Sequence, residues 1–66
     1  MIALALRVEL DWEDDGRVVA EVVTEGFEGV IAYGGTVEEA VAQVSRLAIA
    51  VFFDRLATGE LVLLPV

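Results

Sequence analysis

Apolar and polar residues alternate along the first part of the chain. From Ile2 to Trp12 every even-numbered residue is apolar, whereas positions 7, 9 and 11 carry charged side chains. A period of two residues is typical of a strand with one buried face. An acidic turn follows and ends at Gly16, and a second alternating segment covers residues 17–23. We therefore expect a β-hairpin, with Trp12 among the core residues.

A three-residue loop at 14–16 sets the register of this hairpin. It pairs the even positions of the two strands, so that all of the paired apolar side chains share one face. The same register places Glu9 directly opposite Glu21, and like charges in that position destabilise a sheet. Val19 and Val23 then fall on the outer face, which is more apolar than a water-facing strand usually is.

The rest of the chain predicts one more strand, a long helix and a last strand. Residues 30–33 form the short third strand, and Gly34-Gly35 end it. Thr36 and Glu39 fit a capping box, so we expect a helix from Val37 to Ala57 that stops at Gly59. Residues 61–64 are interpreted as a final strand, ended by Pro65. The order β-β-β-α-β predicts a single α+β domain over residues 1–66, an antiparallel sheet with the helix packed on one face.

The predicted helix has two apolar sides. At 100° per residue, one stripe is expected to pack on the sheet; it contains Val37, Ala40, Val41, Val44, Leu47, Ala48, Val51 and Phe52. A second row lies on the other side, and one core cannot bury both sides of a helix. We therefore predict an interface between copies of the chain, formed by Ala42, Ile49, Phe53 and Leu56 together with Val19 and Val23.

Composition supports association. The chain has only 66 residues, of which 58% are hydrophobic, and it contains no Cys. A core of this size supplies only ~3–5 kcal/mol of net stability, and disulfides are excluded. We expect a homo-oligomer, either a dimer or a tetramer, because association is the remaining source of stability.

The charge balance narrows the function. Twelve Asp and Glu residues against four Arg give a formal charge of −8, with no Lys and no His. Nucleic acid binding needs clustered cations, so we expect no direct nucleic acid binding by this chain alone. The missing Cys and His residues remove the thiol nucleophile, the commonest general base and the commonest zinc ligand. We expect no enzyme activity, no catalytic residue and no cofactor.

The residues also argue against a metal-dependent nuclease and against a membrane or secreted protein. The carboxylates of the first hairpin could hold metal ions for nuclease chemistry. However, Asp14 and Asp15 sit in a turn, and a solvated acidic hairpin is the simpler interpretation; we expect no metal site.

The apolar runs are shorter than the ~20 residues of a membrane span, and Arg7 and Glu9 interrupt the first run before a signal-peptide core forms. We expect a cytoplasmic protein that does not enter a membrane.

Short motifs resemble the HicB-like antitoxin family. The run Val19-Ala20-Glu21-Val22 resembles the family's Y-V-A-E-V type strand, and residues 32–40, AYGGTVEEA, resemble its G-D-T-x-E-E-A helix start. The acidic hairpin at 8–16 is similar to the first hairpin of the family, and the resemblance extends over residues 6–59. Two features differ: residues 23–29 replace the usual P-x-L-P-G-C loop, and we expect no C-terminal DNA-binding segment of the kind common in the family, because residues 60–66 carry no such motif.

The resemblance implies a β-β-β-α-β domain related to a partial RNase H fold, which neutralises a small basic HicA-type ribonuclease toxin by covering its active site. Carboxylates can stand where RNA phosphates would lie, and opposite potentials speed encounter. The expected partner-binding residues are Glu9, Asp11, Glu13, Asp14, Asp15, Glu21 and Phe27. The alternative is an orphan homo-oligomeric scaffold that binds an unrelated protein or a small molecule.

Overall fold

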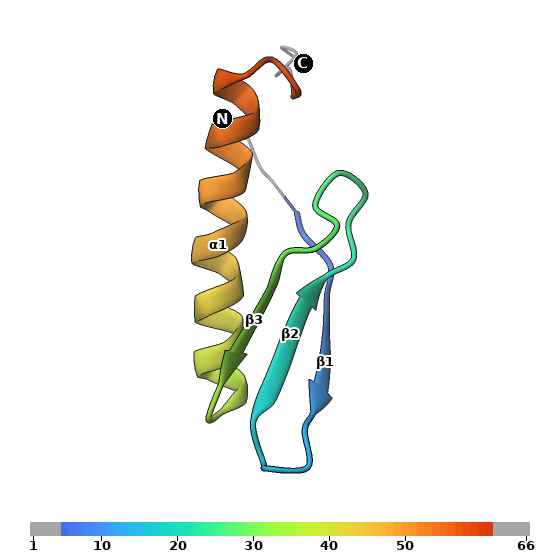
Figure 1. Cartoon of the computed structure of the whole chain (residues 1–66), viewed down its shortest axis with the longest axis vertical. Helices are drawn as coiled ribbons and strands as arrows, with labels where there is room; N and C mark the ends of the chain where they lie inside the picture. Colours follow the sequence, from blue (N-terminus) through green and yellow to red (C-terminus); the bar gives the residue numbers. More distant parts are fainter. Residues whose placement is uncertain (1–4, 62–66) are drawn as a thin grey trace.

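The computed structural model describes residues 5–61 and consists of an antiparallel sheet packed against one long helix (Figure 1). Strands β1 (Val8–Trp12), β2 (Val18–Val22) and β3 (Ile31–Gly34) lie in the order β1-β2-β3, and helix α1 (Val37–Ala57) follows. This arrangement confirms the predicted α+β class. The first strand is shorter than predicted and begins at Val8. The predicted last strand falls, apart from Leu61, outside the described residues.

The hairpin register is the predicted one. Trp12 pairs with Val18, and Glu9 lies opposite Glu21. The turn is closed by two backbone hydrogen bonds, in which the N–H of Glu13 donates to the carbonyl of Arg17 at 2.8 Å and the N–H of Gly16 donates to the carbonyl of Glu13 at 2.9 Å. Gly16 has a φ of +90°, a conformation that glycine adopts without strain. The loop therefore has the three residues that the alternation requires.

Helix α1 begins and ends as predicted, with one difference at its start. The N–H of Glu39 donates to the Thr36 hydroxyl at 3.1 Å, as in a capping box. The Glu39 carboxylate, however, accepts from the N–H of Gly35 at 2.8 Å, one residue earlier than the capping-box partner. At the other end Gly59 has a φ of +80°, and the N–H of Glu60 bonds to the Arg55 carbonyl at 2.9 Å. This is the glycine stop that the sequence predicts.

The core is thin and lies between β2, β3 and the helix. It consists of small side chains with one aromatic ring: Val18, Ala20, Val22, Phe27, Val30, Ala40, Val44 and Ala48. Helix α1 packs against β3 and β2, whereas β1 is the edge strand farthest from the helix (Figure 1). Because the helix covers two of the three strands, the inner face of β1 is left partly open.

This lateral position corrects two predictions about burial. Trp12 was expected in the core, but its side chain is 60% exposed, because α1 packs mainly over β3 and β2 and Trp12 lies at the end of the outer strand β1. Within the predicted sheet-packing stripe, Val37, Val41 and Leu47 remain more than a third exposed, whereas Ala40, Val44 and Ala48 are buried. The buried stripe is therefore narrower than the apolar stripe.

Candidate protein-binding surface

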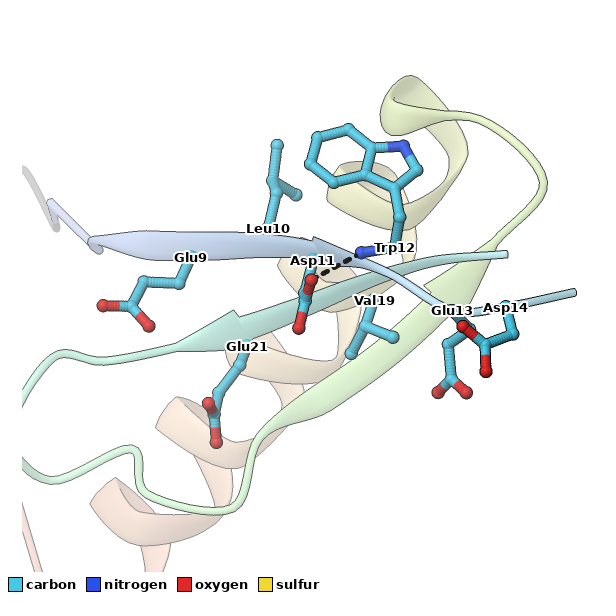
Figure 2. A pocket seen from close by; sticks show the side chains of 8 residues that line it. All are labelled: Glu9, Leu10, Asp11, Trp12, Glu13, Asp14, Val19 and Glu21. Carbon is cyan, nitrogen blue, oxygen red and sulfur yellow. Dashed lines mark hydrogen bonds between the residues drawn. The ribbon is translucent and has the colours of Figure 1, made fainter. Parts of the chain in front are cut away.

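Strand β1 separates two surfaces of opposite character. Its side chains alternate, so Glu9 and Asp11 project from one face, while Leu10 and Trp12 project from the other (Figure 2). The even positions pair with the buried residues of β2, which places Leu10 and Trp12 on the side of the sheet that carries α1. The odd positions lie on the outer face, on the side of the sheet away from α1.

Carboxylates gather in a shallow hollow on the outer face. Its volume is about 520 Å³. Five of the seven predicted partner-binding residues line it, together with Val19, Leu10 and Trp12 (Figure 2): Glu9, Asp11, Glu13, Asp14 and Glu21. We call these five residues the acidic surface. The sequence prediction therefore identified side chains that the hairpin brings together, since the β1–β2 register puts Glu9 and Glu21 side by side.

Few positive charges offset the acidic surface. Among residues 5–61 the structure contains one ion pair, in which Arg17 Nε lies 2.8 Å from Asp15 Oδ2. Asp15 lies in the turn and does not line the hollow. The side chain of Asp11 accepts a hydrogen bond from the N–H of Trp12 at 2.8 Å, which fixes its carboxylate at the strand (Figure 2). The five lining carboxylates are thus available to cations from outside.

Two carboxyl groups have perturbed acidities, and both lie in loops. The N–H of Arg17 donates to Asp15 at 3.0 Å, and this bond, together with the nearby guanidinium, lowers the pKa of the Asp15 carboxyl. In the loop before β3, backbone N–H donors of Glu28 itself and of Gly26 lower the pKa of the Glu28 carboxyl, with a smaller contribution from Arg55. In both cases a hydrogen bond to the ionised form is the main cause.

Phe27, one of the predicted partner-binding residues, is buried and is not exposed to a partner in the isolated domain. Its side chain is only 4% exposed and is part of the core. The loop folds back on itself, since the N–H of Phe27 donates to the Thr24 carbonyl and the N–H of Val30 donates to the Phe27 carbonyl. The guanidinium of Arg55 lies 5.6 Å from the centre of the ring and covers it. The sequence signal for burial was that Phe27 is the sole apolar side chain in a Gly-rich acidic loop.

The residues predicted to form an interface between copies lie in two separate places. On the helix, Ala42, Ile49 and Phe53 are exposed, the last two by 52% and 62%, whereas Leu56 is half-buried. Val19 and Val23 are on the opposite side of the molecule, in and beside the outer face of the sheet. A twofold-symmetric contact, which uses the same patch on both copies, would therefore not use both groups.

Sequence reasoning missed several exposed apolar residues. Ile31 and Tyr33 of β3 lie on the outer face, where the Arg17 guanidinium sits 4.9 Å from the centre of the Tyr33 ring. Leu10 and Trp12 are exposed on the inner side. The alternation itself could have placed Ile31 and Tyr33 on the outer face, because they pair with Glu21 and Val19.

In the part of the chain that the structure describes, no three carboxylates converge closely enough to hold a metal ion. Over the same residues, no helix combines the length and the apolarity that crossing a bilayer requires. Comparison with known proteins gives no match: no family model, no curated protein and no solved structure is similar to this chain.

Proposed function

We propose that this chain is an antitoxin-type interaction domain of the HicB-like kind, which neutralises a small basic ribonuclease toxin by covering its active site. The observation that supports the proposal is the gathering of Glu9, Asp11, Glu13, Asp14 and Glu21 in one hollow on the uncovered face of the sheet. The domain binds and does not catalyse, and its action takes place in the cytoplasm, where the toxin meets mRNA.

The chemistry of an RNA-cleaving partner fits this hollow. A ribonuclease holds the phosphates of its substrate with Lys and Arg side chains, and an inhibitor that covers those cations needs negative groups in their place. Glu9 and Glu21 lie opposite each other and repel in the free domain. A cation placed between them relieves that repulsion. The relief makes the free energy of binding more favourable, because the repulsion remains in the isolated domain.

The second candidate is an orphan homo-oligomeric scaffold that binds an unrelated protein or a small molecule. The observation that favours it is the exposure of Ile49 and Phe53 on the helix. This candidate predicts a stable homo-oligomer that is purified without a companion and that leaves basic ribonucleases active. The two candidates differ in the role of the acidic surface, which is essential in the first and dispensable in the second.

The test is co-expression with a small, Lys- and Arg-rich ribonuclease of HicA type, taken from beside the gene for this chain where such a protein is encoded there. We expect the wild-type domain to restore growth and to form a complex on gel filtration that dissociates at high salt, because exposed charge pairs are screened. The variant Glu9→Gln/Asp11→Asn/Glu21→Gln removes three charges from the acidic surface and is expected to lose both activities.

The matched control is Glu25→Gln/Asp54→Asn/Glu60→Gln, which removes the same charge from exposed positions outside the hollow. It is expected to protect as the wild type does. The proposal is wrong if the toxin stays fully active with the wild-type domain, or if the two triple variants are equally impaired, since the latter result indicates a dependence on net charge alone.

A further inference from the structure

The inner side of β1 and the adjacent flank of α1 border one groove, whose lining is apolar apart from Ser45 and the backbone. A groove of about 460 Å³ runs between them, with Leu6 and Val8 on one side and Val41 and Ile49 on the other. Its floor is formed by core residues of β2 and the helix, Val22 and Val44. Of the exposed side chains, Val41 and Ile49 line the groove. Leu10 and Trp12 continue the inner row of β1, and Val37 and Phe53 lie four residues before Val41 and four residues after Ile49 on the helix. We call these six side chains, which are exposed by 36–62%, the apolar surface: Leu10, Trp12, Val37, Val41, Ile49 and Phe53.

Trp12 belongs to this surface because of its level in the sheet. It pairs with Val18, which pairs in turn with Gly34, and Gly34 lies against the first turn of α1 at Glu39 and Ala40. Trp12 is therefore level with the N-terminal part of the helix, on the side of the sheet that α1 occupies. The apolar surface thus runs from Trp12 and Val37 at one end to Ile49 and Phe53 at the other.

We propose that a second copy of this chain docks on the apolar surface, so that the two copies form a twofold-symmetric dimer. The area supports this occupant. Given that an aromatic side chain presents ~150–250 Å², the six side chains together expose on the order of 500 Å². That is near the upper limit of the largest patch on a monomeric protein, ~300–600 Å². It is also the greater part of the ~800 Å² per partner that a stable interface buries.

Charge separates this surface from the one that serves a basic partner. The lining carboxylates project from the opposite face of β1, and although Leu10 and Trp12 border the same hollow, none of the six side chains of the apolar surface carries a charge. Glu38 shares the same flank of the helix by position, and it is exposed, so it remains hydrated at the rim. A cationic partner finds no counter-charge in the centre of this surface, whereas a second copy offers an apolar surface of equal size.

The shape of the surface suits a twofold contact. In α1 the distance from Val37 to Phe53 is about 24 Å, at 1.5 Å per residue. A twofold axis near the middle of that span brings the Trp12 end of each copy to the Phe53 end of the other, so each aromatic ring is covered by apolar atoms. In such a dimer both acidic surfaces face outward. If the proposed function holds, on which this consequence rests, one dimer binds two basic partners.

Salt dependence distinguishes this contact from binding of a basic partner. Each copy carries a formal charge of −8, so two copies repel at long range. Added salt screens that repulsion and leaves the apolar contact intact. The dimer is therefore expected to tighten as salt increases, whereas a complex with a basic protein weakens.

Sedimentation equilibrium of the full chain across the micromolar range tests the proposal. We expect a monomer–dimer equilibrium in which Trp12→Gln and Phe53→Gln each raise the dissociation constant by about tenfold or more, as at the central aromatic residues of other interfaces. Leu47→Gln, at a position 41% exposed on the other flank of the helix, and Tyr33→Gln on the outer face are matched controls. They are expected to leave the constant within about twofold of wild type. Because Trp12 and Phe53 are exposed, circular dichroism of both variants should match wild type.

Three results would overturn the proposal. One is that the wild-type chain is a monomer at every concentration. This result counts against the proposal even if a chain without residues 62–66 forms a dimer, because the chain's own end would then occupy the surface in the wild type. Another is a dimer that the two control substitutions weaken as much as the Trp12 and Phe53 substitutions do. The third is a dimer that weakens as salt increases. Glu9→Gln/Asp11→Asn/Glu21→Gln should keep the dimer in every case, so a failure of toxin binding leaves this test unaffected.

Discussion

Glu9 of β1 and Glu21 of β2 are direct partners across the ladder, with both carboxylates on the outer face of the sheet. Like charges in this position destabilise a sheet. Within residues 5–61 the sole ion pair, between Arg17 and Asp15, is at the turn and does not offset this repulsion. The Glu9–Glu21 pair lowers the stability of the free domain, but it would favour binding of a partner that places a cation between the two carboxylates. The pair is therefore unfavourable for folding and favourable for binding.

Replacing one member by a cation should therefore stabilise the free domain. We expect Glu21→Arg to raise the free energy of unfolding by about 0.2–1 kcal/mol, because an opposite-charge pair with Glu9 replaces a like-charge pair. Thermal unfolding at low salt measures the change. Under the proposed function, the same variant should bind a basic partner more weakly, since the acidic surface loses one negative charge and gains a positive one.

Glu21→Gln is the control for that substitution. It removes the repulsion without creating an attraction, so its unfolding temperature should fall between those of wild type and Glu21→Arg. If Glu21→Arg unfolds below wild type at low salt, the two side chains do not interact across the ladder as their positions indicate. The difference between the variants should also shrink in high salt, because both carboxylates are accessible to solvent.

Asp15 confers a pH dependence on the turn. Its hydrogen bonds with Arg17 lower the pKa of its carboxyl below the ordinary value of 3.8, so the folded state favours the ionised form. The resulting stability is present above pH 3.8 and is lost as the pH falls through the lowered folded pKa. Asp15→Asn, which resembles the protonated carboxyl, should lower the unfolding temperature near neutral pH, and the difference from wild type should vanish at lower pH.

Unfolding scans of both proteins over the acid range measure this prediction. Asp14→Asn, the neighbouring turn residue, is the matched control. A difference in unfolding temperature between Asp15→Asn and wild type that persists unchanged well below pH 3.8 would mean that the substitution acts through the shape of the turn and not through the charge.

Gly34 is required by close packing between β3 and the helix. A Cβ atom at this position would lie 2.5 Å from the Ala40 nitrogen and 2.7 Å from Glu39 Cβ. Gly34→Ala should therefore reduce the free energy of unfolding by about 1–3 kcal/mol or more, since backbone atoms must move to make space. Gly35→Ala is the control, because its Cβ would meet only the flexible end of Glu39, at 3.3 Å. Urea unfolding of both variants should show the larger loss at position 34.

The sequence was sufficient for the parts of the fold that depend on local periodicity. Alternation fixed the pairing of Trp12 with Val18, because a shift by one residue would have moved every apolar side chain of β1 to the outer face. The ends of α1 followed from Thr36 and Gly59, whose roles depend on a few neighbouring backbone groups. The five carboxylates of the acidic surface were predictable for the same reason, as products of the hairpin register.

The position of the helix across the sheet was not predictable in this way. An apolar stripe indicates which side of a helix is buried, but it does not indicate which strands the helix covers. Here α1 packs over β3 and β2, so Trp12 is exposed although its strand has the pattern of a buried face. Phe27 was misjudged for a related reason: its burial depends on how the loop folds back on the core, which no periodicity expresses.

Trp12 also provides a direct optical test of the apolar surface. It is the single tryptophan of the chain, and 60% of its side chain is exposed in the isolated domain. Docking of a second copy would bury the indole, so the emission maximum should shift to shorter wavelength as the protein concentration rises through the dissociation constant. Phe53→Gln should keep the long-wavelength emission over the same range, and Leu47→Gln should behave as wild type. Emission that is independent of concentration in all three proteins would show that the indole is not covered by a second copy.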